Sequence, residues 1–117
     1  MTNSELLARE CIRHTMASYT MAGDRLQTED FIAVFTEDAI LETEGVPERD
    51  AFRHAGRPAI HTWINRWRER PEADGKPVHQ ASFVRHHLST SLIDLVDEET
   101  AKARTYWTAY TDIGPDH

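Results

Sequence analysis

The stretch SFVRHHLSTSLIDLVDEETAKARTYWTAYT, residues 82–111, decides the fold class of this chain. Residues 82–96 alternate in a strand-like way, and residues 100–111 are rich in the β-branched and aromatic side chains typical of strands. Between them, residues 97–99 form an acidic turn signal. Two long strands joined by a tight turn predict an antiparallel hairpin.

Helices are predicted ahead of this hairpin. Apolar residues at helical spacing indicate a first helix over about 4–22, with Ser4 as its N-cap and Gly23 as its C-terminal stop. A second, shorter helix is predicted to begin with Thr28 as its N-cap. Acidic residues follow in its first turn, where they favour the positive end of the helix dipole.

A third helix and two short strands complete the pattern. Apolar residues recur at i, i+3, i+4 and i+7 over 60–67, Pro58 fits the first helical turn, and Pro71 ends the helix ahead of a polar loop. Short strands are expected at 39–43 and 51–54. Because helices come first and an antiparallel sheet follows, the sequence predicts an α+β fold rather than alternating βαβ units.

The composition limits the partners and the location of the protein. The 117 residues (1–117) suit one domain that can bury a core, and the single cysteine permits no internal disulfide. The net charge of −7 argues against nucleic acid, which needs a basic surface. No apolar run approaches the roughly twenty residues of a membrane span, and no export signal is visible. We expect a cytoplasmic protein with neither nucleic-acid nor membrane partners.

The motif search leaves acid–base chemistry as the main candidate. Seven histidines are present, but adjacent His86 and His87 on a strand point to opposite faces and cannot share one metal ion. Cys11 lies at an apolar position of the first helix and is expected to be a core residue rather than a nucleophile. The sequence holds no phosphate-binding, dinucleotide-binding or nucleophile-elbow motif. We therefore expect neither a metal nor another cofactor.

Strand parity divides the residues around the two adjacent histidines into two faces. His87 shares one face with Ser89, Ser91 and Ile93, whereas His86 lies on the other. Parity alone does not say which face is the interior, and a shift of one residue exchanges the two faces.

Five motifs occur in an order that resembles a known family over about residues 5–112. They are Tyr19-x4-Asp24, Phe31-x3-Phe35-Thr36-Glu37-Asp38-Ala39, Gly56-Arg57-x2-Ile60, Arg85-His86-His87-Leu88-x-Thr90-Ser91 and Thr100-Ala101-x-Ala103. This order resembles the SnoaL-like proteins of the nuclear-transport-factor-2-like superfamily, whose relatives include scytalone dehydratase, bile-acid dehydratase and polyketide cyclases. The resemblance implies a cone-shaped barrel in which N-terminal helices pack on a curved antiparallel sheet.

The resemblance also implies a catalytic site. Asp24 matches the family's catalytic aspartate, His87 its partner histidine, and Tyr19 a tyrosine that can contact a substrate carbonyl. A carboxylate beside an imidazole makes it a better base, and a tyrosine hydroxyl can donate to a developing oxyanion. A small cyclic hydrophobic substrate would be bound by aromatic and histidine side chains, namely Phe35, Trp63, His86 and Trp107.

Two classes of function stay open. One is a cofactor-free lyase or isomerase of the dehydratase or cyclase kind. The other is a noncatalytic ligand-binding or assembly module, in which Asp24 is a helix-end cap or pairs with Arg25, and Tyr19 and His87 are core residues. Relatives usually continue beyond the region of Tyr110 with further strands. We therefore expect an open sheet edge, and with it either a homodimer or higher homo-oligomer that covers the edge, or a truncated chain.

Overall fold

The computed structural model describes residues 1–68 and 84–111. The predicted helix end at Pro71, the loop after it and the start of the strand at 82–83 lie outside the described residues. In chain order the elements are α1 (Asn3–Asp24), α2 (Thr28–Ile32), β1 (Ile40–Glu42), the 3-10 helix η1 (Glu48–Asp50), β2 (Arg53–Ala55), α3 (Arg57–Arg68), β3 (Val84–Leu95) and β4 (Ala101–Thr111). The described residues form two compact units, one of residues 1–25 with 84–111 and one of residues 26–68.

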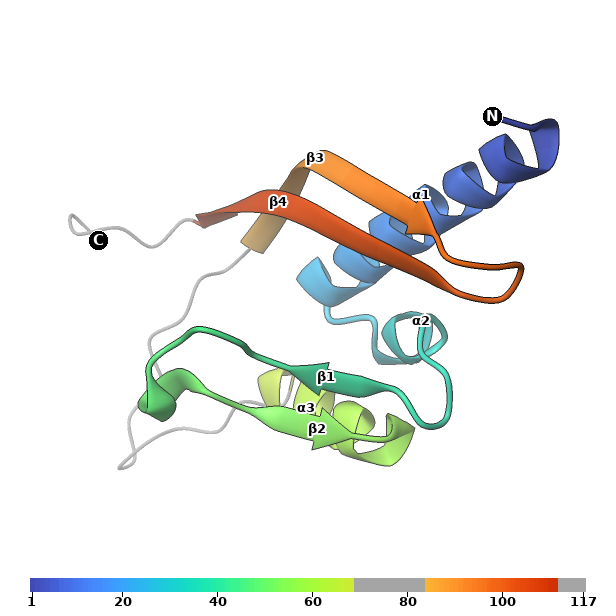
Figure 1. Cartoon of the computed structure of the whole chain (residues 1–117). Coiled ribbons are helices and arrows are strands. Elements are labelled where there is room, and N and C mark those ends of the chain that lie inside the picture. Colours follow the sequence, from blue (N-terminus) through green and yellow to red (C-terminus); the bar gives the residue numbers. More distant parts are fainter. Residues whose placement is uncertain (69–83, 112–117) are drawn as a thin grey trace, which may run out of the picture. The chain divides into compact units, whose positions relative to one another are not determined.

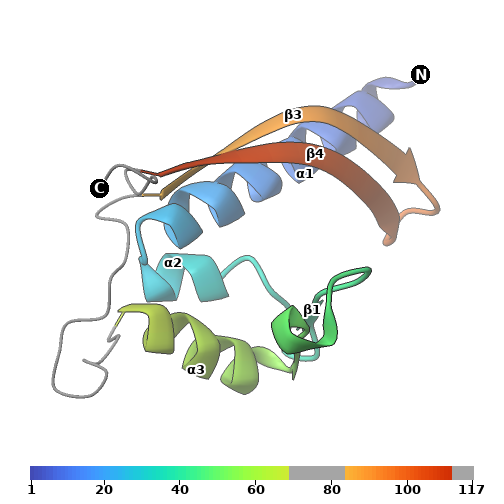
Figure 2. The ribbon, with the colours of Figure 1, turned by 90° about the vertical axis from the view of Figure 1, so that its left-hand side faces the viewer.

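The first unit consists of α1 and the predicted hairpin. Strands β3 and β4 pair antiparallel from Val84 opposite Thr111 to Leu95 opposite Ala101, which confirms the hairpin. Both strands curve along their length, and α1 runs beside β3 (Figure 2). The turn is closed by Asp97, whose Oδ1 accepts hydrogen bonds from the backbone N–H groups of Glu99 and Thr100.

A β-bulge interrupts the hairpin. Leu88 lies opposite Trp107, and the next regular pair joins Ser91 to Thr105. Two residues of β3 therefore stand opposite the single residue Tyr106 of β4, which is the defining arrangement of a bulge and increases local twist and bending. Because of the extra residue, the side chains of β3 change parity at this point.

Helix α1 begins earlier and ends later than the sequence predicts. Thr2, not Ser4, is the N-cap, and it forms a capping box with Glu5. The helix continues through Gly23 to Asp24. Cys11 is exposed, so the expectation of a core cysteine is wrong: the residues of α1 that face β3 are on another side of the helix.

The small core of the first unit lies between α1 and β3. Ala22 of α1 and Ile93 of β3 are both 3% exposed. Arg9, near the start of α1, donates from its guanidinium to the backbone carbonyl of Ile93. This contact holds the first half of α1 against the strand that carries the two adjacent histidines.

The second unit packs α2 and α3 with the β1–β2 hairpin (Figure 1). Strands β1 and β2 pair antiparallel with Leu41 opposite His54. The buried residues are Phe31 of α2, with Ile60 and Ile64 on one stripe of α3. The α+β order and the third helix with Pro58 in its first turn are thus as predicted.

Thr28 has a different role from the predicted cap. The N-cap of α2 is Gln27, which makes no side-chain cap bond. The Thr28 side chain is instead buried, and its hydroxyl donates to Oδ1 of Asn65 on α3 at 3.0 Å. A tertiary hydrogen bond has taken the hydroxyl that the local pattern assigned to the helix end.

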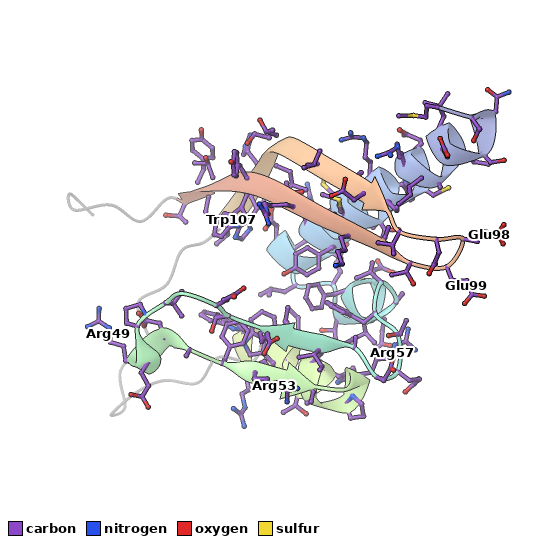
Figure 3. The ribbon with its side chains drawn as sticks, in the orientation of Figure 1. Arg49, Arg53, Arg57, Glu98, Glu99 and Trp107 are labelled. Carbon is purple, nitrogen blue, oxygen red and sulfur yellow. The ribbon has the colours of Figure 1, made fainter. Side chains whose placement is uncertain are left out.

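Arg57 at the start of α3 ties the second unit together (Figure 3). Its Nη2 donates to the carbonyl of Ile32 at 3.2 Å, and its Nη1 pairs with Glu37 at 3.2 Å. The carbonyl of Ile32, the last residue of α2, also accepts the backbone N–H of Phe35 at 3.1 Å. Arg57 therefore fixes the end of one helix to the beginning of the next.

Candidate active site

Asp24 is the last residue of α1, where the helix does not favour a carboxylate. The negative end of the helix dipole lies there, and anionic side chains are stabilised at the other end. The Asp24 side chain is nevertheless only 5% exposed. A buried carboxylate requires hydrogen-bond donors, and β3 provides them.

His86 of β3 bonds to both carboxylate oxygens of Asp24. Its backbone N–H donates to Oδ2 at 2.7 Å, and its ring Nδ1 bonds to Oδ1. An ionised carboxylate only accepts, so Nδ1 is the donor in this bond and, whenever the ring is neutral, Nε2 keeps its lone pair. The His86 side chain is 38% exposed. The structure thus holds a partly exposed imidazole against a buried carboxylate, which favours one tautomer of its neutral ring.

The expected pairing of Asp24 with His87 is corrected to Asp24 with His86. The physical reason is the bulge, since simple alternation back from buried Ile93 would place His87 on the inner face, and the extra residue puts His86 there instead. His87 lies on the opposite face, with its ring edge-on to Tyr110, the centroids 4.7 Å apart and the planes at 72°.

Tyr19 lies on α1, five positions before Asp24 in the sequence. Burial raises the pKa of its hydroxyl above the ordinary value, and the negative charge of Asp24 raises that pKa further. The phenol, like an ordinary tyrosine, is protonated at neutral pH and is a hydrogen-bond donor rather than a base. Of the predicted set of Asp24, His87 and Tyr19, the structure thus couples Tyr19 electrostatically to Asp24.

Trp107 of β4 contacts the ring of His86. The two centroids are 5.0 Å apart and the planes are tilted by 59°. The contact follows from the register, in which Trp107 lies opposite Leu88, two positions from His86 on the same face. Trp107 is 59% exposed, and it stands on β4 at the end of the hairpin away from Glu98 and Glu99 (Figure 3).

The predicted substrate contacts Phe35 and Trp63 belong to the second unit. They are part of an aromatic cluster, which we define as Phe31, Phe35, Phe52, His54 and Trp63. Phe31 contacts Phe35 and Trp63 with centroids 5.2 and 6.2 Å apart, and Trp63 contacts Phe52 at 5.5 Å.

His54 is the polar member of the aromatic cluster. Its ring stacks on Phe52 with centroids 5.0 Å apart and lies 5.7 Å from the ring of Trp63. Its Nε2 is buried and has no hydrogen-bond partner among the described residues. The only sequence signal for this contact was the spacing of two, which puts Phe52 and His54 on one face of a strand.

Two classes of feature are not found in the part of the chain that the structure describes. In residues 1–68 and 84–111 no three His, Cys, Asp or Glu side chains come together as a metal site would require. No helix in those ranges is long and apolar enough to cross a membrane.

Comparison with solved structures identifies the fold. A provisionally assigned scytalone dehydratase from Novosphingobium aromaticivorans is 25% identical, with a TM-score of 0.73 over 95% of this chain and 64% of its own. A provisionally assigned aromatic ring hydroxylase from the same organism is 21% identical, with a TM-score of 0.69 over 92% of this chain and 66% of its own. This chain thus spans slightly less than two thirds of the length of either protein.

A third structure has the same fold at lower identity. The β subunit of a provisionally assigned aromatic-ring-hydroxylating dioxygenase, also from N. aromaticivorans, is 15% identical, with a TM-score of 0.69 over 93% of this chain and 69% of its own. No protein of curated function matches the sequence significantly. The family model for the SnoaL-like domain matches residues 4–116, which is nearly the whole chain. The chain belongs to the SnoaL-like family and has the α+β fold of the nuclear-transport-factor-2-like superfamily.

Proposed function

We propose that this protein is a cofactor-free lyase or isomerase that removes a proton from a small cyclic hydrophobic molecule, with Nε2 of His86 as the base. The observation that carries the proposal is the bonding of His86 to Asp24 through both the ring and the backbone. This arrangement fixes the tautomer that leaves Nε2 free, and it stabilises the imidazolium that forms when Nε2 takes a proton.

The chemistry balances without a cofactor. Nε2 of His86 takes a proton from a carbon next to a carbonyl, a carbon–carbon double bond forms, and the bond to a β-hydroxyl breaks. The leaving hydroxide takes the proton back from His86 and departs as water. Tyr19, whose phenol is protonated at neutral pH, donates a hydrogen bond to the carbonyl oxygen as negative charge develops there. If the proton returns to another carbon instead, the same base produces an isomer.

The family membership supports this reaction class, as does the likeness to a provisionally assigned scytalone dehydratase. A fold by itself does not specify a reaction, so the proposal depends on the Asp24–His86 pair. The alternative, a noncatalytic ligand-binding or assembly module, gives His86 and Asp24 a structural role only. The two proposals make opposite predictions for a base-dependent reaction.

The test uses 5-nitrobenzisoxazole, a flat apolar probe of positioned bases. A base removes its ring C–H proton, the N–O bond breaks, and the electron pair leaves on the oxygen of a coloured cyanophenolate. We expect H86A to lower the rate by about 100-fold or more, the usual contribution of a positioned base, whereas H87A stays within about threefold of the wild type. The adjacent residue on the other face is a matched control for effects on folding.

Equal rates for wild type and H86A would contradict the proposal and favour the noncatalytic module. A native mass spectrum of the purified protein identifies any retained molecule. That molecule is a candidate substrate, and the rates of wild type, H86A and H87A are compared with it as well. D24N should lower the rate with that molecule as well, because Asp24 orients the ring and balances its charge.

A further inference from the structure

The contact between Trp107 and His86 suggests a role for the indole beyond that of a pocket wall. Large aromatic side chains usually bury most of their surface, yet Trp107 is 59% exposed. The ring that it contacts is His86, which is bonded to the buried carboxylate of Asp24. The indole is therefore an exposed aromatic side chain directly beside the proposed base.

The separation of the two rings suits an interaction with a charged imidazole. The centroids are 5.0 Å apart, inside the roughly 6 Å range in which a cation is attracted to the face of an indole. Tryptophan provides the strongest attraction of the three aromatic side chains. A neutral imidazole gains much less from the same contact. The indole thus favours the protonated form of His86, which is the form that proton removal creates.

We propose that Trp107 is a positioning residue for His86: it holds the imidazole between itself and Asp24 and stabilises its protonated state. The catalytic consequence rests on the proposed function, but the effect on protonation does not.

The groups around His86 allow the effect of the indole on its protonation to be separated from the effects of other charged and titratable groups. Helix α1 presents Asp24, with Tyr19 coupled to it, and β4 presents Trp107. Arg85 and His87 flank His86 on its own strand but point to the opposite face. Of these groups Asp24 is the charged one that contacts the ring, and it is unchanged by a substitution at Trp107. A change in the protonation of His86 on substituting Trp107 is therefore due to the indole.

The opposite face provides a matched control. There His87 contacts Tyr110 much as His86 contacts Trp107, with centroids 4.7 Å apart. Tyr110 is 55% exposed, which is close to the exposure of Trp107. Loss of Tyr110 removes an exposed aromatic ring from the same end of the hairpin without touching His86. It reports what general damage to the hairpin does to the titration of His86.

The experiment is a titration of the full chain without substrate, followed by nitrogen-15 NMR of the histidine side chains, with H86A and H87A to assign the resonances. In W107L we expect the pH at which half of His86 is protonated to fall by about half a unit. W107F, which keeps an aromatic face, restores most of the shift. Y110L leaves His86 unchanged. With the benzisoxazole probe, W107L lowers kcat rather than raising KM.

An unchanged His86 titration in W107L would overturn the proposal, and so would a shift of equal size in Y110L. If W107L loses the hairpin, W107M is used in its place, because methionine keeps apolar bulk without an aromatic ring. A wild-type protein that fails to turn over the probe, while the titration of His86 still shifts in W107L, contradicts the proposed function alone. If the His86 titration does not shift in W107L, while H86A still loses turnover of the probe, the result contradicts the role of Trp107 alone.

Discussion

His86 and Ile93 face the same side of the hairpin although they are seven positions, an odd number, apart along β3. Simple alternation would place them on opposite faces. The bulge opposite Tyr106 supplies the extra residue that brings them together. The position of the proposed base beside Asp24 therefore depends on a local irregularity of one strand.

Deletion of Thr90 tests this relationship. The deletion leaves one residue opposite Tyr106 and converts the ladder into a regular antiparallel one, with Leu88 still opposite Trp107 and Ser91 still opposite Thr105. We expect His86 to keep its bond to Asp24, while the hairpin loses part of its bend. The strongly shifted NMR signal of the Nδ1 proton, assigned with H86A, measures the bond. Transfer of that signal to His87 would show that the ladder slips instead.

The coupling between Tyr19 and Asp24 leads to a second prediction. D24N removes the negative charge that contributes to the raised pKa of Tyr19, so that pKa should fall. It should stay above the ordinary value of about 10, because burial is the larger cause. Carbon-13 NMR of labelled tyrosine resolves Tyr19 from the other tyrosines. An unchanged pKa in D24N would mean that the carboxylate does not act on the phenol.

The raised pKa of Tyr19 also has a consequence for stability. The unfolded chain loses the phenol proton near pH 10, before the folded protein does. The contribution of Tyr19 to stability is therefore complete below that pH and is lost as the pH rises toward the folded pKa. Urea unfolding of wild type and Y19F across the alkaline range measures this, and Y19F should lose less stability than the wild type. Parallel curves for the two proteins would contradict it.

A fourth prediction concerns Asp97 in the tip of the hairpin. The backbone N–H of Glu99, and then that of Thr100, hold the pKa of this carboxyl below its ordinary value. The stabilisation is present above the unfolded pKa of about 3.9 and is lost as the pH falls through the lower, folded pKa. D97N keeps an acceptor oxygen but cannot titrate, so its thermal unfolding should depend less on pH in this acidic range. D97A, which loses the acceptor, should be less stable than D97N at neutral pH.

The sequence predicted the larger elements well and the details of the site less well. The strand ends next to the turn were each placed to within one residue, because β-rich runs on both sides of an acidic turn are a local signal. The bulge has no such signal, since Ser89 and Thr90 are ordinary strand residues and neither is a glycine. The resemblance thus identified Asp24 and the two adjacent histidines as candidate site residues. The choice between His86 and His87 required the register of both strands.

Thr28 shows the same limit in the second unit. Its neighbours in sequence made it a good N-cap, but its hydroxyl bonds to Asn65, which is 37 positions away. Nothing in a local window reports a partner at that distance. A tertiary hydrogen bond therefore replaced the local use of the hydroxyl that the sequence predicted.

The last prediction follows from this bond. T28V keeps the shape of a buried side chain that is 3% exposed, but it removes the donor to Oδ1 of Asn65. Asn65 also bonds to Nδ1 of His61, whose Nε2 pairs with Glu29, so one hydroxyl begins a chain of polar contacts between α3 and α2. We expect T28V to lower the free energy of unfolding by about 1–3 kcal/mol, the range for a buried polar group left without its partner. Urea unfolding at neutral pH measures the difference.

T36V is the matched control, because the Thr36 hydroxyl is exposed and its loss should change the free energy of unfolding by less than about 0.5 kcal/mol. Equal effects of the two substitutions would show that the contact between α2 and α3 does not depend on this hydroxyl.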